Sequence, residues 1–272
     1  MKRNRLRELL NLGKPTLETA IIIPWPGMVE IIGNTRIFDY VEISGEYMPW
    51  NLHDLDNISR AIELYDMSSM MKVDQNNRSF IAQRALGAGL QNMLFADIRT
   101  VDDAKECVRI VKSETPESKG INGCHMRRNV GYTKEGASPA YVQAMNESVI
   151  AIMIEKKEAI DNLKEILSVD GIDMIQFGPG DLSMSLGIPG QFSHPKIKSI
   201  EIEVIKTAVE MGKRPRVELL PNYNIENIQK YIQLGVKDFG LSIDVMILDS
   251  WLTKNGEILT KILKDMKLKD LT

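Results

Sequence analysis

The sequence predicts an α/β fold, a single (β/α)8 TIM barrel with an extended excursion between its fourth and fifth strands. Short apolar runs, which are typical of strands buried on both faces, alternate along the chain with segments of helical spacing. A doubly wound open sheet is the competing fold, and it would place a glycine-rich turn after the first strand. The first run leads instead into Pro24-Trp25-Pro26-Gly27, so we expect a closed barrel.

Eight apolar runs are the candidate strands of this barrel. They are Ala20–Ile23, Tyr40–Ile43, Met70–Val73, Asn92–Phe95, Val149–Ile154, Met174–Phe177, Arg216–Leu220 and Phe239–Ile243. After the second run, Leu55, Ile58 and Ile62 recur at helical spacing, and after the seventh run Gly235 is placed to end a helix. No linker or internal repeat marks a second domain, so we expect residues 1–272 to form one.

The interval between the fourth and fifth runs is longer than one helix requires. Val101, Ala104 and Val108 predict a helix over Thr100–Ser113, which leaves the excursion Glu114–Met145, a segment rich in Gly, Ser, Asn and Arg. Long loops in compact domains are often functional. We therefore expect an ordered flap or a subunit contact.

The last part of the chain predicts a helix over about residues 254–267. Ile258, Ile262, Leu263 and Met266 give this helix an apolar face. That face is able to dock on its own barrel or on a neighbouring subunit, and the sequence does not choose between them.

Composition excludes several classes of protein. The formal net charge is -3, and acidic and basic residues are interspersed, so we expect no nucleic-acid partner. No apolar stretch reaches the roughly 18 residues that span a membrane. Arg7 and Glu8 interrupt the apolar part of the basic N-terminus, which predicts a short amphipathic helix rather than a signal peptide. Cys107 and Cys124 form no CxxC motif, which fits a reducing compartment, and we expect a cytoplasmic protein.

In a barrel of this kind the active site lies at the carboxyl ends of the strands. Acidic and basic side chains follow the apolar runs at these points, a mixture that suits a hard cation with oxygen ligands and an anionic substrate. They are Glu46 and Tyr47 after the second run, Lys72 and Asp74 at the third, Asp97 and Arg99 after the fourth, Glu155 after the fifth, Asp181 after the sixth and Glu218 in the seventh.

Glu155 and Asp181 are the candidate metal ligands. They stand 26 residues apart, the length of one strand–helix–strand unit, and so follow neighbouring strands. Magnesium and manganese often take only one or two protein carboxylates. Asp181 is alternatively a helix N-cap. Gly180 leaves backbone amides open to a substrate carboxylate, or simply forms a tight turn.

Two segments resemble the HpcH/HpaI aldolases, metal-dependent class II aldolases of 2-oxo acids related to citrate lyase. Ile154–Gly190 is similar to the family stretch that ends in GPxDLSxSLG, and Asp39–Asn57 is similar to a family pattern of the form DxxxIDGEHxP. The resemblance runs from about Pro15 to Trp251, so it covers most of the chain.

The resemblance implies a carbon–carbon lyase that works through a pyruvate-type enolate. Glu155 and Asp181 would hold Mg2+, Mn2+ or Co2+, and the cation would act as a Lewis acid on the 2-oxo acid. The amides of Gly180 and Asp181 would bind the substrate carboxylate. The partners implied are the 2-oxo acid, an aldehyde and further copies of the chain, since such aldolases commonly form hexamers.

The chain departs from the family pattern in the half of the site that transfers protons. Tyr47 stands where the family has histidine, Ser44 where it has aspartate, and Gly87 where the acidic partner of the histidine is found. A phenol has a pKa of about 10 and is a poor base at neutral pH. Tyr47 is therefore predicted to be a hydrogen-bond donor or general acid toward an aldehyde oxygen. The alternative is that its ring only packs at the opening formed by the carboxyl ends of the strands, which we call the mouth of the barrel.

Further departures concern the substrate. Lys72 replaces the arginine that ends the third strand in the family; it would contact the keto oxygen, or act as a base or Schiff-base nucleophile if burial lowered its pKa. Met153 replaces a glutamine, and Gln176 on the next strand is expected to supply a similar amide. Glu46 and Arg127 are further substrate-binding candidates, Arg127 for a second anionic group or for an ion pair between subunits.

The leading hypothesis is a metal-dependent aldolase that acts on a 2-oxo acid. Because the histidine base is missing, a hydrolase, decarboxylase or isomerase that uses the same metal–enolate site is the alternative. A third hypothesis is a catalytically silent barrel that binds a metabolite.

Overall fold

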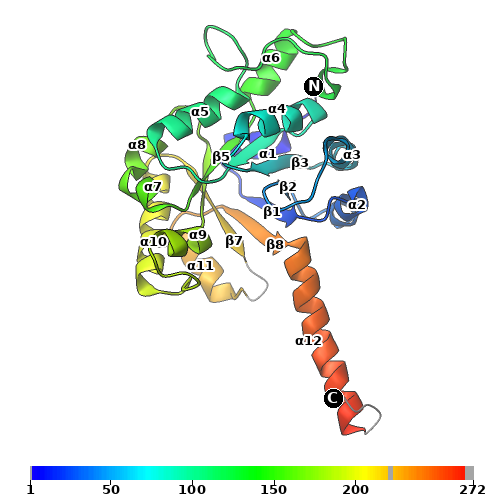
Figure 1. The fold of residues 1–272 in the computed structure, drawn as a ribbon, viewed down its shortest axis with the longest axis vertical. Coiled ribbons are helices and arrows are strands. Elements are labelled where there is room, and N and C mark those ends of the chain that lie inside the picture. The colour runs from blue at the N-terminus through cyan, green and yellow to red at the C-terminus, as the bar shows by residue number, and fades with distance from the viewer. Residues whose placement is uncertain (1, 220–222, 267–272) are drawn as a thin grey trace.

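The computed structural model describes residues 2–219 and 223–266 (Figure 1). Parallel strands close into a barrel in the order of the sequence, from β1 to β8, with β8 paired to β1. This confirms the predicted (β/α)8 barrel. The strands are β1 Thr16–Ile21, β2 Tyr40–Ser44, β3 Ser68–Val73, β4 Asn92–Phe95, β5 Ile150–Ile154, β6 Met174–Phe177, β7 Arg214–Leu219 and β8 Asp238–Ile243.

Helices connect consecutive strands on the outside of the barrel. They are α2 Pro26–Asn34, α3 Leu52–Ile62, α4 Arg78–Ala88, α5 Val101–Val111, α7 Lys157–Asp161, α8 Leu163–Leu167, α9 Pro179–Ser185, α10 Pro195–Glu210 and α11 Ile225–Gln233. Local sequence sets several of their starts. Asn51 and Asp54 form a capping box before α3, and Thr100 and Asp103 form another before α5.

The predicted strands all occur, and two of them, β4 and β6, match to the residue. The prediction began β1 and β7 too late, because polar, charged or proline residues precede each apolar run. Glu18 in β1 is buried in a regular strand, and β7 begins with Arg214 and Pro215, two residues before the predicted start. The predicted end of the seventh run, Leu220, lies outside the described residues.

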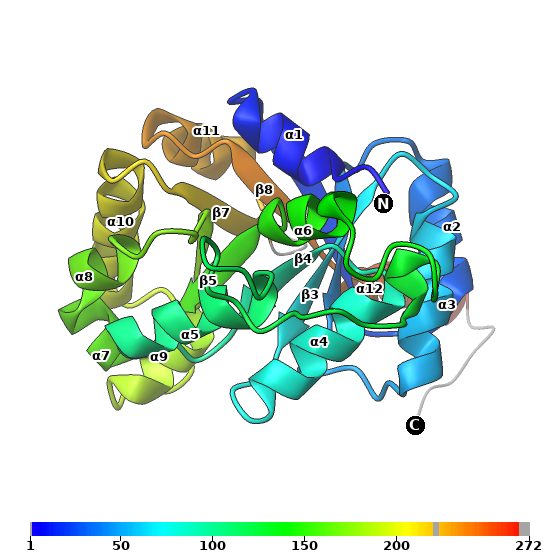
Figure 2. The ribbon, with the colours of Figure 1, turned by 90° about the horizontal axis from the view of Figure 1, so that it is seen from above.

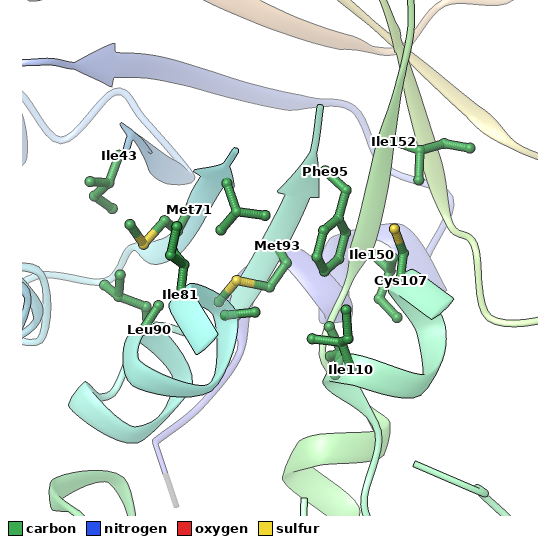
Figure 3. Close-up of a cluster of buried hydrophobic side chains, with 14 of the residues drawn as sticks. Ile43, Met71, Ile81, Leu90, Met93, Phe95, Cys107, Ile110, Ile150 and Ile152 are labelled. Atoms are coloured by element: carbon green, nitrogen blue, oxygen red, sulfur yellow. The ribbon is translucent and has the colours of Figure 1, made fainter. Parts of the chain in front are cut away.

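Most of the apolar core lies between the strands and the surrounding helices. Figure 3 shows part of it, where Met71 and Phe95 on the outer faces of β3 and β4 pack with Ile81 of α4 and Ile110 of α5. A second apolar cluster lies inside the barrel, next to the N-terminal ends of the strands.

The first helix, α1 Arg5–Asn11, closes the N-terminal end of the barrel and confirms the predicted short helix. Its residue Leu6 is fully buried against Tyr40, Met70 and Leu94 of the interior. Arg7 fixes the helix from outside through an ion pair with Asp173, 2.7 Å between Nη2 and Oδ2. The opposite, C-terminal end of the barrel remains available for a site.

The excursion lies along the N-terminal end of the barrel and not over its mouth. It contains a 3-10 turn, η1 Arg128–Val130, and α6 Pro139–Asn146, which lies beside α1 (Figure 2). Arg128 anchors it to the ends of α3 and α4, with Nη2 2.6 Å from Glu63 Oε2 and Nη1 2.9 Å from the Ala88 carbonyl oxygen. The expected flap is therefore not formed within one chain, because this ion pair and this hydrogen bond hold the segment at the other end.

The last helix, α12 Asp244–Asp265, begins directly after β8, well before the predicted start near residue 254. No glycine or proline breaks residues 244–255, so helical structure continues from the strand end. Figure 1 shows α12 projecting away from the barrel instead of packing against it. Residue 267, the predicted end, lies outside the described residues.

None of the helices in residues 2–219 and 223–266 is long and apolar enough to cross a membrane. The cytoplasmic location expected from the sequence stays a prediction.

Candidate metal and substrate site

The barrel brings most of the predicted site residues together at the carboxyl ends of its strands. The loop after β2 carries Glu46 and Tyr47, and β3 carries Lys72, the register neighbour of Ser44. Glu155 follows β5, and Asp181 lies in the first turn of α9 after β6, the next strand of the barrel. These residues form two groups, one around Lys72 and one around Glu155.

Glu155 is a buried carboxylate, with 4% of its surface exposed. Its Oε1 atom accepts a hydrogen bond of 2.7 Å from the backbone N–H of Asp97. Burial raises the pKa of Glu155, and the charge of Asp181 adds to the rise, while the Asp97 amide and Lys72 oppose it. No Lys or Arg of the described residues pairs with Glu155, so its charge is left for another cation.

The backbone around Glu155 is shaped to hold this carboxylate. Asp97 has a φ of 57°, in the left-handed region, and this conformation accompanies the hydrogen bond from its N–H to Glu155. Gly178 stands on the other side, where a Cβ would come within 2.6 Å of Glu155 Oε2. A larger residue at position 178 would therefore displace the carboxylate.

Asp181 is more open, with 47% of its side chain exposed. Its Oδ1 atom accepts a hydrogen bond of 2.7 Å from Lys156 Nζ, which also lies 3.1 Å from Asp97 Oδ1. The N-cap of α9 is Gly178, and it makes no side-chain cap, so the alternative prediction of Asp181 as an N-cap was wrong. Asp181 instead faces the mouth as the third residue of the helix.

The donor set fits a hard divalent cation. Within the described residues no group of three or more His, Cys, Asp and Glu is arranged around one point. Two oxygen ligands from Glu155 and Asp181, completed by substrate and water, are typical of Mg2+ and Mn2+. The buried, unpaired carboxylate of Glu155 and the close approach of Gly178 are the observations that favour such a site.

Lys72 lies in a compact cluster with Tyr47 and Glu46. Its Nζ atom is 2.8 Å from Tyr47 Oη and 2.7 Å from Glu46 Oε2. Burial opposes the lysine charge, but Tyr47 and Glu46 outweigh it, and the pKa of Lys72 is raised. This arrangement favours Lys72 as an ammonium over the predicted alternatives of a base or a Schiff-base nucleophile.

Tyr47 keeps its proton in the same cluster. Burial raises the pKa of its phenol, although Lys72 opposes the rise. The phenol oxygen accepts the hydrogen bond from Lys72, and the interaction of the phenol with Glu46 adds to the rise. With 51% of its surface exposed, Tyr47 borders the mouth and does more than fill the core.

Gly180 and Arg127 differ in their distance from this site. A Cβ on Gly180 would meet only Phe192, at 4.0 Å, so its backbone is open on the mouth side of α9. Arg127 belongs to the excursion, where Nη1 donates 2.7 Å to the Gln83 carbonyl oxygen and the side chain packs over Gly87 of α4. The structure does not place Arg127 with the mouth residues of its own chain.

A cluster of charged side chains inside the barrel, beneath the mouth, was not predicted from the sequence. Arg216 is buried in the barrel interior, where its Nε atom donates 2.7 Å to Gln176 Oε1 and its Nη2 atom pairs with Glu42. Gln176 is thus bound to Arg216 and not directed freely into the mouth. We call the residues Glu18, Glu42, Gln176, Arg216 and Glu218 the interior cluster. Charged residues at alternate positions of β1, β2 and β7 were the available signal.

Comparison with known proteins agrees with this geometry. The model of the HpcH/HpaI aldolase/citrate lyase family matches residues 30–247. The chain belongs to this family. It is 26% identical over 246 residues to a 4-hydroxy-2-oxo-heptane-1,7-dioate aldolase from Escherichia coli, with 90% of each chain covered. The predictions of family and of a carbon–carbon lyase are confirmed.

Solved structures of the family share the fold. An HpcH/HpaI family protein from Burkholderia cenocepacia superposes with a TM-score of 0.83 at 24% identity, covering 96% of this chain and 99% of the other. CitE from Mycobacterium tuberculosis, crystallised with magnesium and acetate, gives a TM-score of 0.56 at 10% identity, covering 89% and 88%. Dependence on a divalent metal is general in this family.

Proposed function

We propose that this protein is a divalent-metal-dependent aldolase that forms the enolate of a 2-oxo acid and joins it to an aldehyde, or cleaves the resulting aldol. The observation that carries the proposal is the pair Glu155 and Asp181 on neighbouring strand ends, with Glu155 buried and without a cationic partner in the described chain. Family membership and the Escherichia coli relative support the same reaction class.

Glu155 and Asp181 would hold the cation, with Mg2+, Mn2+ and Co2+ as the candidates. A divalent cation at this point supplies Lewis acidity to the keto and carboxylate oxygens of a 2-oxo acid. Lys156 forms ion pairs with both Asp181 and Asp97. Its ammonium group would keep the ion pair with Asp97 if Asp181 bound a cation. Gly180 would leave room for the substrate carboxylate to reach the backbone amides of α9.

Lys72 would stabilise the negative charge that develops on the enolate oxygen. Its ammonium is fixed by Glu46 and Tyr47 before the substrate arrives, so little reorganisation accompanies the reaction. Glu46 then positions Lys72 and need not contact the substrate. Tyr47 would donate its O–H to the aldehyde oxygen and protonate the alkoxide formed in the condensation.

Oxaloacetate with and without Mn2+ tests this proposal. Loss of CO2 from oxaloacetate generates the pyruvate enolate directly, so the protein is expected to accelerate CO2 release when Mn2+ is present and to lose this activity in EDTA. Deuterium uptake into the methyl group of pyruvate is the second measurement. If neither reaction occurs and EDTA changes nothing, the enolate mechanism is wrong.

We also propose that the protein is a homo-oligomer in which α12 docks on a neighbouring copy, with the hexamer of related aldolases as the expected size. Figure 1 shows α12 standing clear of its own barrel. Large apolar side chains of this helix are exposed, which is unusual for a monomer. They include Met246, Ile247, Leu248, Trp251, Leu252, Ile258, Leu259 and Ile262.

The barrel has a matching gap where a helix is missing. Leu17 of β1 and Leu241 and Ile243 of β8 alternate with inward-facing residues, so they point outward, and they are only partly buried. On the other strands such outward residues are covered by helices. A helix such as α12 from a second copy would cover this surface.

Light scattering on the purified protein tests the assembly. The wild type is expected to be an oligomer, and Trp251→Glu is expected to reduce its mass because a charge enters the proposed contact. Lys264→Glu, an exposed position on the opposite face of the same helix, is the control and should leave the mass unchanged. A monomeric wild type would exclude the proposal.

A further inference from the structure

We propose that Glu218 is the base that removes the proton from carbon 3 of the 2-oxo acid, working as one half of a carboxyl pair with Glu18. The inference rests on the proposed function, because it supplies the proton acceptor for the enolate described above. It also fills the position left open by Tyr47, which replaces the histidine of related aldolases and keeps its own proton.

The two carboxyl groups meet over a glycine. Gly240 of β8 pairs in register with Glu218 of β7 and with Glu18 of β1, so the three residues are neighbours across three strands. A Cβ on Gly240 would overlap both Glu18 Oε1 and Glu218 Oε2. Because position 240 has no side chain, the barrel leaves a space in which the two carboxyl groups approach each other.

This region of the barrel carries more negative than positive charge. Glu18 from β1, Glu42 from β2 and Glu218 from β7 face one guanidinium, that of Arg216. Lys72 from β3 acts on Glu218 from a greater distance, since its ammonium is bound to Glu46 and Tyr47. β6 contributes the neutral Gln176 and β8 contributes Gly240. One carboxyl group therefore has to keep a proton in this buried environment.

Glu18 is the member that holds this proton. It is fully buried, and neither of its oxygens receives a hydrogen bond from a donor in the described residues. Burial raises its pKa well above the ordinary value, and the charge of Glu218 adds to the rise. Its O–H then donates to Glu218, as in other pairs of carboxyl groups that share one proton.

Glu218 is the member nearer the mouth. It is partly exposed and precedes the last residue of β7, while its Oε1 atom is itself buried and has no hydrogen-bond partner among the described residues. Glu218 and the metal-ligand candidate Glu155 both lie at the carboxyl ends of their strands, and Lys72 opposes the rise in the pKa of each. Burial raises the pKa of Glu218 to about 7, with Glu42 adding to the rise and Arg216 opposing it. A base with this pKa is suited to work near neutral pH.

The step balances without a further reactant. The C–H bond at carbon 3 breaks, its electron pair becomes the carbon–carbon double bond of the enolate, and the proton forms an O–H bond on Glu218. The hydrogen bond from Glu18 weakens as this happens, because Glu218 becomes neutral. In the reverse direction the same O–H returns its proton to carbon 3.

Two reactions of one enolate separate this inference from the proposed function. Deuterium uptake by pyruvate in D2O with Mn2+ requires a base, whereas CO2 release from oxaloacetate forms the enolate without removing a proton. The variants are Glu218→Gln, which resembles the protonated acid in shape, and Gly240→Ala, which pushes the pair apart. Glu165→Gln, an exposed glutamate of α8, is the matched control.

Glu218→Gln and Gly240→Ala are expected to lower deuterium uptake on the order of 100-fold and to leave CO2 release close to that of the wild type. Wild-type uptake should rise with pH through about 7 and then level off, because Glu218 must be ionised to accept a proton. The control should behave as the wild type in both reactions.

Wild-type uptake in a folded Glu218→Gln variant would overturn the inference while leaving the aldolase proposal intact. So would an equal loss of both reactions in that variant, because it would assign Glu218 to a step before proton transfer. A wild type that fails in both reactions would instead overturn the proposed function itself. As a measurement on the metal-free protein, the unfolding free energy of Glu218→Gln should lose the pH dependence that the pair gives the wild type.

Discussion

Two pairs of carboxyl groups lie near the barrel mouth, Glu155 with Asp181 and Glu18 with Glu218. The surroundings of the two pairs differ, and so do the roles that we propose for them. Glu155 accepts a hydrogen bond from a backbone N–H, and Asp181 is half exposed and bound to Lys156. Glu18 and Glu218 approach each other over Gly240, and the charge of Arg216 acts on both. The first pair leaves Glu155 without a cationic partner among the described residues, which suits a bound cation, whereas the second pair is arranged to share a proton.

The comparison shows that the surroundings and not the residue type set the chemistry. Burial raises the pKa of Glu155 as well as those of Glu18 and Glu218, but a backbone N–H opposes the rise at Glu155, whereas Glu18 receives no hydrogen bond from the described residues. Lys72 opposes the rise in the pKa of both Glu155 and Glu218. Substitutions on each side should therefore have separable effects.

The largest effect is expected from Glu155→Gln, which removes the buried charge from the first pair. Titration calorimetry with Mn2+ should show affinity weakened by more than about 100-fold, because the amide leaves a single carboxylate ligand. Glu218→Gln should bind Mn2+ as the wild type does. Equal weakening in the two variants would mean that the pairs do not differ in function.

Lys72→Met should have the next largest effect. Loss of the ammonium that faces the enolate oxygen is expected to reduce CO2 release from oxaloacetate on the order of 100- to 1,000-fold. Lys72→Arg should recover part of the rate because it restores the charge. The Lys72→Met variant should also need a higher pH for deuterium uptake, since Lys72 favours ionised Glu218. An unchanged rate of CO2 release would remove Lys72 from the mechanism.

The pH dependence of stability distinguishes the pairs in the metal-free protein. The pKa of Glu218 is raised on folding, so its stabilising contribution is complete below its ordinary value of 4.5 and is lost as the pH rises through about 7. Urea unfolding should therefore show the wild type losing stability relative to Glu218→Gln over this range, by at most on the order of 3 kcal/mol. Glu165→Gln should run parallel to the wild type. A constant difference between wild type and Glu218→Gln would show that Glu218 does not titrate there.

The smallest effect is expected from Tyr47→Phe, which belongs to neither pair. The ring is retained and Lys72 keeps its contact with Glu46, so CO2 release should change little. Cleavage of a 4-hydroxy-2-oxo acid should fall by about tenfold or more, because the alcohol oxygen loses its hydrogen-bond partner. Equal rates of cleavage in Tyr47→Phe and wild type would show that the phenol only packs in the mouth.

Local patterns were sufficient to predict the strands and the first pair. A strand buried on both faces needs an apolar run, and residues that follow consecutive runs meet at one end of a parallel barrel. Glu155 and Asp181 could therefore be placed together from spacing alone. The same reasoning placed Lys72 and Tyr47 at the mouth, but not their contact, which depends on the loop between them.

The sequence could not predict the second pair, because Glu18 and Glu218 are 200 residues apart and meet only when β8 closes the barrel between them. In the sequence Glu18 preceded the first apolar run and Glu218 was one of the polar side chains at the strand ends, and no local pattern linked the two. The position of Arg127 could not be predicted either, since the excursion is placed by the ion pair of Arg128 with Glu63 and by its hydrogen bond to the Ala88 carbonyl oxygen.

By itself the sequence determined the barrel, the family and the carboxylates that face the mouth, because these follow from periodicity and from the order of elements along the chain. Only the tertiary structure decided which charges are paired inside the barrel, which end the excursion covers, and that α12 leaves its own barrel. Those features depend on burial and on contacts between residues distant in sequence, and such contacts set the pKa values that separate a metal ligand from a proton carrier.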